Sequence, residues 1–157
     1  GHCGERNDKA GILAEAGVTD TAAVNRLLNQ EVKLAVEQGL SVLYCIGEKS
    51  EEQDRWQEVL GEQLSTGLSG VDTSRVVIAY EPIWSIGPGK TPAGKEYITK
   101  IARFVKERTG GLDVDNAEML ASIPEIDGGL IALTRFQGEI GFYPEEYLEI
   151  IKTYLGK

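Results

Sequence analysis

Glu81 has the type and position in the sequence to carry out acid–base chemistry, and His2, the only histidine, is of a type that can do so. Glu81 directly follows the apolar run 75–80, which is typical of a strand buried on both faces. The loop after it contains two prolines that stiffen it and two glycines that hinge it. Such a loop can close over a substrate and exclude water. The pattern predicts a general base beneath a lid.

This stretch resembles the base-and-lid motif of the triose-phosphate isomerase family over the twelve residues Ala79-Tyr80-Glu81-Pro82-Ile83-Trp84-Ser85-Ile86-Gly87-Pro88-Gly89-Lys90. Two further motifs are similar to the family's Gly-His-Ser and Cys-Val-Gly-Glu: Gly1-His2-Cys3 and Cys45-Ile46-Gly47-Glu48. The resemblance implies an α/β fold, the TIM (β/α)8 barrel, with only its later βα units represented. Residues 1–157 are then expected to form one incomplete barrel domain, without the N-terminal strands and strand seven.

The resemblance also implies an enzyme. It would be an aldose–ketose isomerase that interconverts dihydroxyacetone phosphate and glyceraldehyde 3-phosphate, or a closely related short sugar phosphate, through an enediolate. Glu81 is the expected base, and His2 is the electrophile that polarises the carbonyl. Cys45 is expected to pack against the base, and Glu48 to be a structural acid. No cofactor and no metal is expected.

The phosphate group is expected to lie on the backbone of Gly87, Gly111 and Leu133. Here the chain departs from the family, because Ala132 and Leu133 occupy the place of two adjacent glycines and Gly111 that of a serine. Arg135 can compensate by binding phosphate through its guanidinium fork, or it faces solvent. The altered site leaves two alternatives open, an isomerase of a tetrulose phosphate and a non-catalytic phosphosugar-binding relative.

A third alternative belongs to another class of enzyme. Glu48 and Glu81 both follow predicted strands, so they could act as the carboxylate pair of a retaining glycosidase. That chemistry needs the two carboxyl groups about 5 Å apart across an open sugar subsite. The glycine- and proline-rich lid fits such a subsite poorly.

The elements that would position these residues alternate along the chain, which is typical of parallel βα units. Apolar periodicity predicts helices over 20–38, 51–66, 92–108 and 115–121, and a last helix from Pro144 whose apolar side chains pack inward. Strands are predicted over 40–46, 75–80 and 127–133. The stretch from Gly1 to about Thr19 is expected to be a polar loop.

Composition limits the classes of partner. The 25 acidic residues exceed the 16 basic ones, and the net charge of −9 argues against nucleic acid. No apolar run approaches the roughly 20 residues of a membrane span. The two cysteines are too few for a disulfide framework or a structural zinc site. We therefore expect a cytoplasmic protein with neither a nucleic-acid nor a membrane partner. The resemblance implies that its partner is a small phosphorylated sugar and that it forms a homodimer.

Overall fold

The computed structural model describes residues 3–86, 89–109 and 144–155. The chain divides into two compact units, residues 1–83 and residues 84–157, which are described separately. The predicted helix over 115–121 and the predicted strand over 127–133 lie outside the described residues. That residues 1–157 form a single domain stays a prediction.

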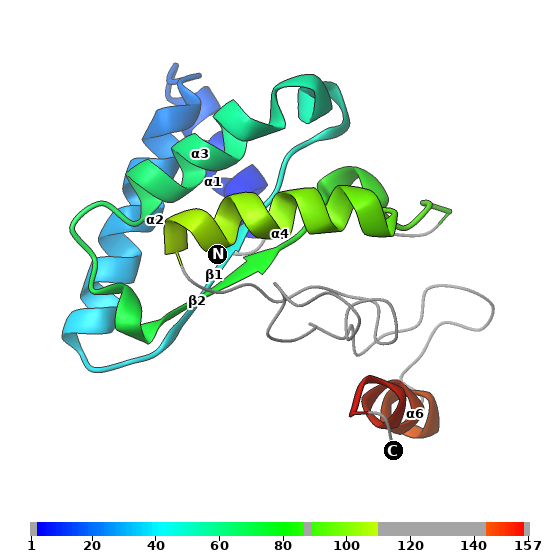
Figure 1. Ribbon diagram of the computed structural model, residues 1–157. Helices are drawn as coiled ribbons and strands as arrows, with labels where there is room; N and C mark the ends of the chain where they lie inside the picture. The colour runs from blue at the N-terminus through cyan, green and yellow to red at the C-terminus, as the bar shows by residue number, and fades with distance from the viewer. Residues whose placement is uncertain (1–2, 87–88, 110–143, 156–157) are drawn as a thin grey trace. The chain divides into compact units, whose positions relative to one another are not determined.

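The first unit is built on two parallel strands, β1 (Val42–Ile46) and β2 (Val76–Tyr80) (Figure 1). Their register pairs Val42 with Val76 and Ile46 with Tyr80. The chain between them forms the 3-10 helix η1 (Ser50–Arg55), the helix α3 (Trp56–Gly67) and the 3-10 helix η2 (Thr73–Arg75). Parallel strands need such a crossover connection. Both predicted strands and the helix between them are confirmed, although the predicted helix begins as a 3-10 turn.

Burial along the two strands differs from the prediction of a strand buried on both faces. Only the last three residues of each strand are buried. The register partners Leu43 and Val77 are 43% and 45% exposed. Because side chains alternate along a strand, this pair lies on the face opposite Tyr44, whose hydroxyl group contacts α3. The apolar run therefore specified a strand correctly but overstated its burial.

Helix α2 (Thr21–Glu37) matches its prediction closely. The side chain of Asp20 caps its start by accepting a hydrogen bond of 2.9 Å from the amide of Ala22. Gly39, with a φ of +79°, follows its end. Its buried face carries, at helical spacing, Val24, Asn25, Leu28, Asn29 and Val32.

The N-terminal stretch corrects the sequence interpretation. Residues predicted to form a polar loop instead form the helix α1 (Cys3–Glu15), which packs against α2. Good helix-forming residues dominate it, and Lys9 pairs with Glu5 at 3.4 Å and with Glu31 of α2 at 2.6 Å. The pairing with Glu31 raises the pKa of Lys9 although burial opposes it. The helix has almost no apolar stripe, so periodicity gave no sign of it.

The second unit contains helices α4 (Lys95–Thr109) and α6 (Pro144–Leu155). The 3-10 helix η3 (Ile83–Ser85) lies where the two units join in the sequence. Helix α4 begins at Lys95, three residues after the predicted start, and its predicted inner face is buried at Ile98, Ile101, Ala102 and Val105. No helix among the described residues has the length and hydropathy of a membrane span.

Helix α6 forms as predicted, but three of the side chains predicted to pack inward are exposed. Leu148, Ile150 and Leu155 are 53%, 36% and 60% exposed. An apolar period is enough to specify a helix, whereas burial also needs a neighbouring surface that covers the stripe. The periodic pattern therefore located the helix but did not predict the exposure of these three side chains.

Candidate functional site

Glu81 lies at the carboxyl ends of both strands. Its amide donates a hydrogen bond of 2.7 Å to the carbonyl oxygen of Ile46, which extends the pairing of β1 and β2 by one step. Its side chain is half-buried. In parallel α/β barrels this edge of the sheet carries the active site. The structure therefore places the predicted base at the edge where the chemistry is expected.

Gly47 brings the end of β1 against the backbone of Glu81. A Cβ atom added at Gly47 would overlap the carbonyl oxygen of Glu81 and lie 2.9 Å from its carbonyl carbon. Since that obstacle is backbone, it cannot rotate away. Glycine is therefore required where the two strand ends approach each other.

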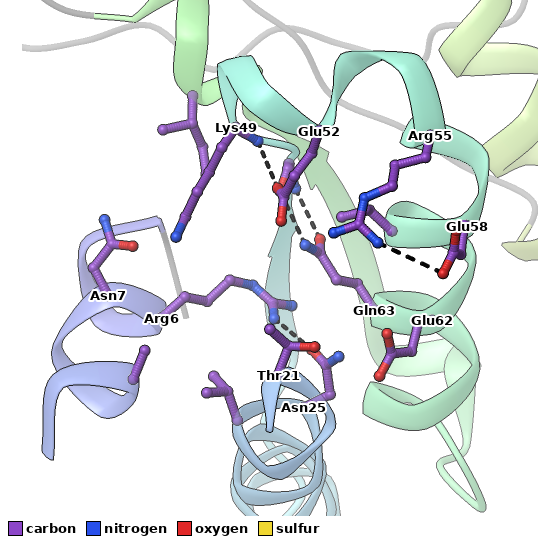
Figure 2. Close-up of a pocket in the computed structure, with 15 residues that line it drawn as sticks. Arg6, Asn7, Thr21, Asn25, Lys49, Glu52, Arg55, Glu58, Glu62 and Gln63 are labelled. Atoms are coloured by element: carbon purple, nitrogen blue, oxygen red, sulfur yellow. Dashed lines mark hydrogen bonds and ion pairs between the residues drawn. The ribbon is translucent and has the colours of Figure 1, made fainter. Parts of the chain in front are cut away.

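The side chain of Gln63, on α3, forms hydrogen bonds with the backbone of Gly47. Its carboxamide accepts a hydrogen bond from the amide of Gly47 and donates one to the carbonyl oxygen of Gly47, both 2.9 Å (Figure 2). Gln63 is buried, with 9% of its surface exposed. The side chain thus satisfies both backbone groups of the residue that touches Glu81.

The hydroxyl group of Tyr44 joins α3 to α1. It donates a 2.8 Å hydrogen bond to the backbone carbonyl of Gln63 and accepts one of 2.9 Å from Nη2 of Arg6. Burial raises the pKa of Tyr44, and the charge of Arg6 partly opposes this. Arg6 also donates to Oδ1 of Asn25 at 2.6 Å (Figure 2). Its Nε donates to the carbonyl oxygen of Cys45 at 3.2 Å. Arg6 therefore links α1 to α2 and β1.

Glu48 has a different environment from Glu81. It is completely buried, and the hydroxyl group of Tyr80 donates to its two carboxylate oxygens at 2.8 and 3.0 Å. This agrees with a structural acid. A glycosidase would need the carboxyl group of Glu48 to face an open sugar subsite, so its burial counts against the pairing of Glu48 with Glu81.

A cavity of about 120 Å³ lies among α1, α2, η1 and α3 (Figure 2). Gln63 and charged side chains of both signs line it. The charged residues are Arg6, Lys49, Glu52, Arg55, Glu58 and Glu62. Pockets for small molecules usually measure about 300–1,000 Å³. Glu81 does not line this cavity, although Gly47, which contacts its backbone, does. The described residues contain no cluster of side chains suited to a metal ion.

Most of the other predicted site residues lie outside the described residues: His2, Gly87, Gly111, Leu133 and Arg135. The structure therefore does not test whether they meet Glu81. The lid residue Trp84 is described, and its ring meets that of Tyr97 edge-on at 5.4 Å within the second unit. This contact anchors the start of the predicted lid to α4.

The sequence interpretation missed Gln63, Tyr44 and Arg6. A signal for Gln63 is present in the sequence, because this polar residue interrupts the buried stripe of α3 between Leu60 and Leu64. A polar side chain at such a position needs a hydrogen-bonding partner. For Arg6 no comparable pattern exists.

Comparisons with known proteins identify a family. The sequence model of the family described as "Triosephosphate isomerase" matches residues 19–153. The triosephosphate isomerase of Prosthecochloris aestuarii is 35% identical over 148 residues, which cover 82% of this chain and 56% of that protein. That of Mycoplasmopsis pulmonis is 36% identical over 118 residues, covering 68% and 47%.

The same family is found among solved structures. The crystal structure of triosephosphate isomerase from Bartonella henselae matches with a TM-score of 0.56 at 28% identity, covering 68% of this chain and 50% of that one. The chain spans about half the length of the curated relatives it matches.

Proposed function

This chain belongs to the triosephosphate isomerase family and carries part of the TIM-barrel fold, and on that premise we propose that the protein interconverts dihydroxyacetone phosphate and glyceraldehyde 3-phosphate. The observation that supports the proposal most is the position of Glu81. It lies half-buried at the carboxyl ends of paired parallel strands, where barrel enzymes bind substrate.

The reaction proceeds by proton transfers at two carbons and two oxygens. The carboxylate of Glu81 removes a proton from the carbon next to the substrate carbonyl, and the electron pair of that C–H bond forms the double bond of an enediolate. His2 donates a hydrogen bond to the oxygen on which charge develops. Glu81 then returns the proton to the former carbonyl carbon, while the hydroxyl proton of the neighbouring carbon passes to the former carbonyl oxygen, for which His2 is the candidate carrier, so that ketose becomes aldose. No redox cofactor or metal takes part.

The phosphate group has a separate role in this proposal. Backbone amides at Gly87, Gly111 and Leu133 bind it, and Arg135 supplies a charged fork. The lid that begins at Trp84 closes over the substrate and keeps water from the enediolate. The protein would act as a cytoplasmic homodimer in glycolysis and gluconeogenesis.

A second candidate function is favoured by one observation in the sequence. Ala132 and Leu133 carry side chains where the family has two adjacent glycines, which changes the space beside the phosphate. A tetrulose phosphate, or binding of a phosphosugar without turnover, would be consistent with that change. Triose phosphate remains the first candidate because the Glu81 segment keeps the family's pattern.

The test is a coupled isomerase assay of the protein as its gene encodes it, with dihydroxyacetone phosphate and with a tetrulose phosphate as substrates. Glu81→Asp shortens the base by one carbon and should lower kcat by about 100-fold. Binding of 2-phosphoglycolate, measured by calorimetry, should change far less, because the phosphate contacts remain.

Glu37→Asp is the matched control, because Glu37 is exposed at the end of α2. A wild-type protein that binds 2-phosphoglycolate without turning over either substrate would favour the non-catalytic relative. Near-wild-type turnover by Glu81→Asp would remove Glu81 from its role as base.

A further inference from the structure

We propose that Gln63 is a positioning residue for the base Glu81, acting through the backbone of Gly47. The inference rests on the proposed function, since it assumes that the carboxylate of Glu81 is the group that must be placed. Gln63 lies on α3, eighteen positions before Glu81 in the sequence, and has no place in the proton transfers themselves. Its role follows from three contacts in the first unit.

The first contact joins Gln63 to Gly47. The two hydrogen bonds of 2.9 Å close a ring between the carboxamide and the amide and carbonyl of one residue. One hydrogen bond would leave Gly47 free to rotate about it. Two bonds to the same residue fix both its position and the orientation of its peptide groups.

The second contact joins Gly47 to Glu81. The carbonyl group of Glu81 fills the space that a side chain at Gly47 would need. The amide of Glu81 donates a hydrogen bond to the carbonyl oxygen of Ile46. The backbone of Glu81 is therefore held by Ile46, the last residue of β1, and by Gly47, which follows it. A shift of Gly47 moves the surface against which Glu81 rests.

The third contact holds Gln63 itself. The Tyr44 hydroxyl bonds to its backbone carbonyl at 2.8 Å and accepts a hydrogen bond from Arg6. Arg6 lies on α1, which begins directly after His2 in the sequence. The side chain of Gln63 is thus presented from a buried, hydrogen-bonded helix turn rather than from a mobile surface.

This arrangement has a kinetic consequence. A base displaced by about 1 Å can lose about 100-fold in rate, because proton transfer depends steeply on distance. Substrate affinity depends mainly on the phosphate contacts, which lie elsewhere in the proposed site. Loss of Gln63 should therefore reduce kcat and leave KM nearly unchanged.

The first experiment compares Gln63→Leu with Gln57→Leu by steady-state kinetics on dihydroxyacetone phosphate. Gln57 is an exposed residue of the same helix, so its substitution controls for a change of glutamine in α3. We expect Gln63→Leu to lower kcat by about 10- to 100-fold with KM within about two-fold of wild type. A kcat within about two-fold of wild type would overturn the assignment.

The second experiment uses Gln63→Glu, which keeps the size of the side chain. When its new carboxyl group is protonated it can donate to the carbonyl of Gly47 and accept from the amide, as glutamine does. When ionised it loses that donor. The ratio of its kcat to that of wild type should therefore rise as pH falls from about 8 to about 5.

That pH profile decides the case even if Gln63→Leu fails to fold. A merely structural glutamine predicts a flat ratio, and a flat ratio would overturn the positioning role. An inactive but folded wild-type protein would overturn the proposed function and this assignment together. An active wild type whose Gln63 variants keep their turnover would overturn this assignment alone.

Discussion

The two strand ends of the first unit look alike in sequence and differ in structure. Each strand is exposed at its start and buried over its last three residues, and each is followed within two residues by a glutamate. After β1, Glu48 is completely buried against the hydroxyl group of Tyr80. After β2, Glu81 keeps part of its surface exposed. The difference shows that two carboxylates in similar places in the sequence can differ in burial according to the residues that surround them.

The difference in burial between the two glutamates arises from the residues that surround each of them in the fold. Tyr80 belongs to β2 but sends its hydroxyl group to Glu48, thirty-two residues away in the sequence. A carboxylate that accepts hydrogen bonds while buried is held in one place and kept from substrate. Glu81 is positioned instead through its backbone, by Gly47 and Ile46. Glu81 as a whole remains partly exposed, whereas Glu48 is completely buried.

The largest expected effect comes from Glu81→Gln, which removes the proposed base. An amide cannot remove the proton, so kcat should fall by about 10²- to 10⁴-fold. The free energy of unfolding should stay within about 1 kcal/mol of wild type, because the side chain is only half-buried. Kinetics and urea denaturation of the same preparation measure both quantities. A large loss of stability would make Glu81 a structural residue like Glu48.

Glu48→Gln should show the reverse pattern, because its main effect is on the free energy of unfolding. The substitution keeps the size but removes the charge that accepts the hydrogen bonds of Tyr80. The free energy of unfolding should fall by about 1.5–3 kcal/mol, as for hydrogen bonds to charged groups. Denaturant unfolding followed by circular dichroism measures it. An unchanged midpoint would mean that the buried carboxylate adds no stability.

Tyr44→Phe should have the smallest effect, because it removes only the hydroxyl group that bonds to Gln63 and Arg6. Gln63 loses the hydroxyl donor at its carbonyl, while Arg6 keeps the carbonyl of Cys45 as an acceptor. We expect a loss of about 1 kcal/mol in the free energy of unfolding. Thermal unfolding of wild type and variant at neutral pH measures it.

The same pair of proteins gives a test of pH dependence. Burial raises the pKa of Tyr44 above its ordinary value of 10.0, so the folded state holds this proton more tightly than the unfolded state does. The stability due to the neutral hydroxyl is complete below pH 10 and is lost as pH rises through the raised value. The advantage of wild type over Tyr44→Phe should therefore shrink in alkali. An advantage that grows there would contradict the assigned direction.

Much of the first unit could be predicted because its signals are local. The cap at Asp20, the apolar stripe of α2 and the two apolar runs each act over a few residues, so they can be recognised without knowing the rest of the fold. Helix α1 could not be recognised in this way. It has almost no apolar stripe, and Arg6 ties it to residues 19 to 39 positions away.

The sequence by itself determined the family and the position of Glu81 at the end of a strand, because both depend on residues that are neighbours in the chain. Only the tertiary structure decided that Glu48 is enclosed while Glu81 stays partly exposed, and that Gln63 holds Gly47. Burial and hydrogen bonding depend on which distant segments meet. The distance in sequence between Gln63, Gly47 and Glu81 is the reason their arrangement appears only in the folded chain.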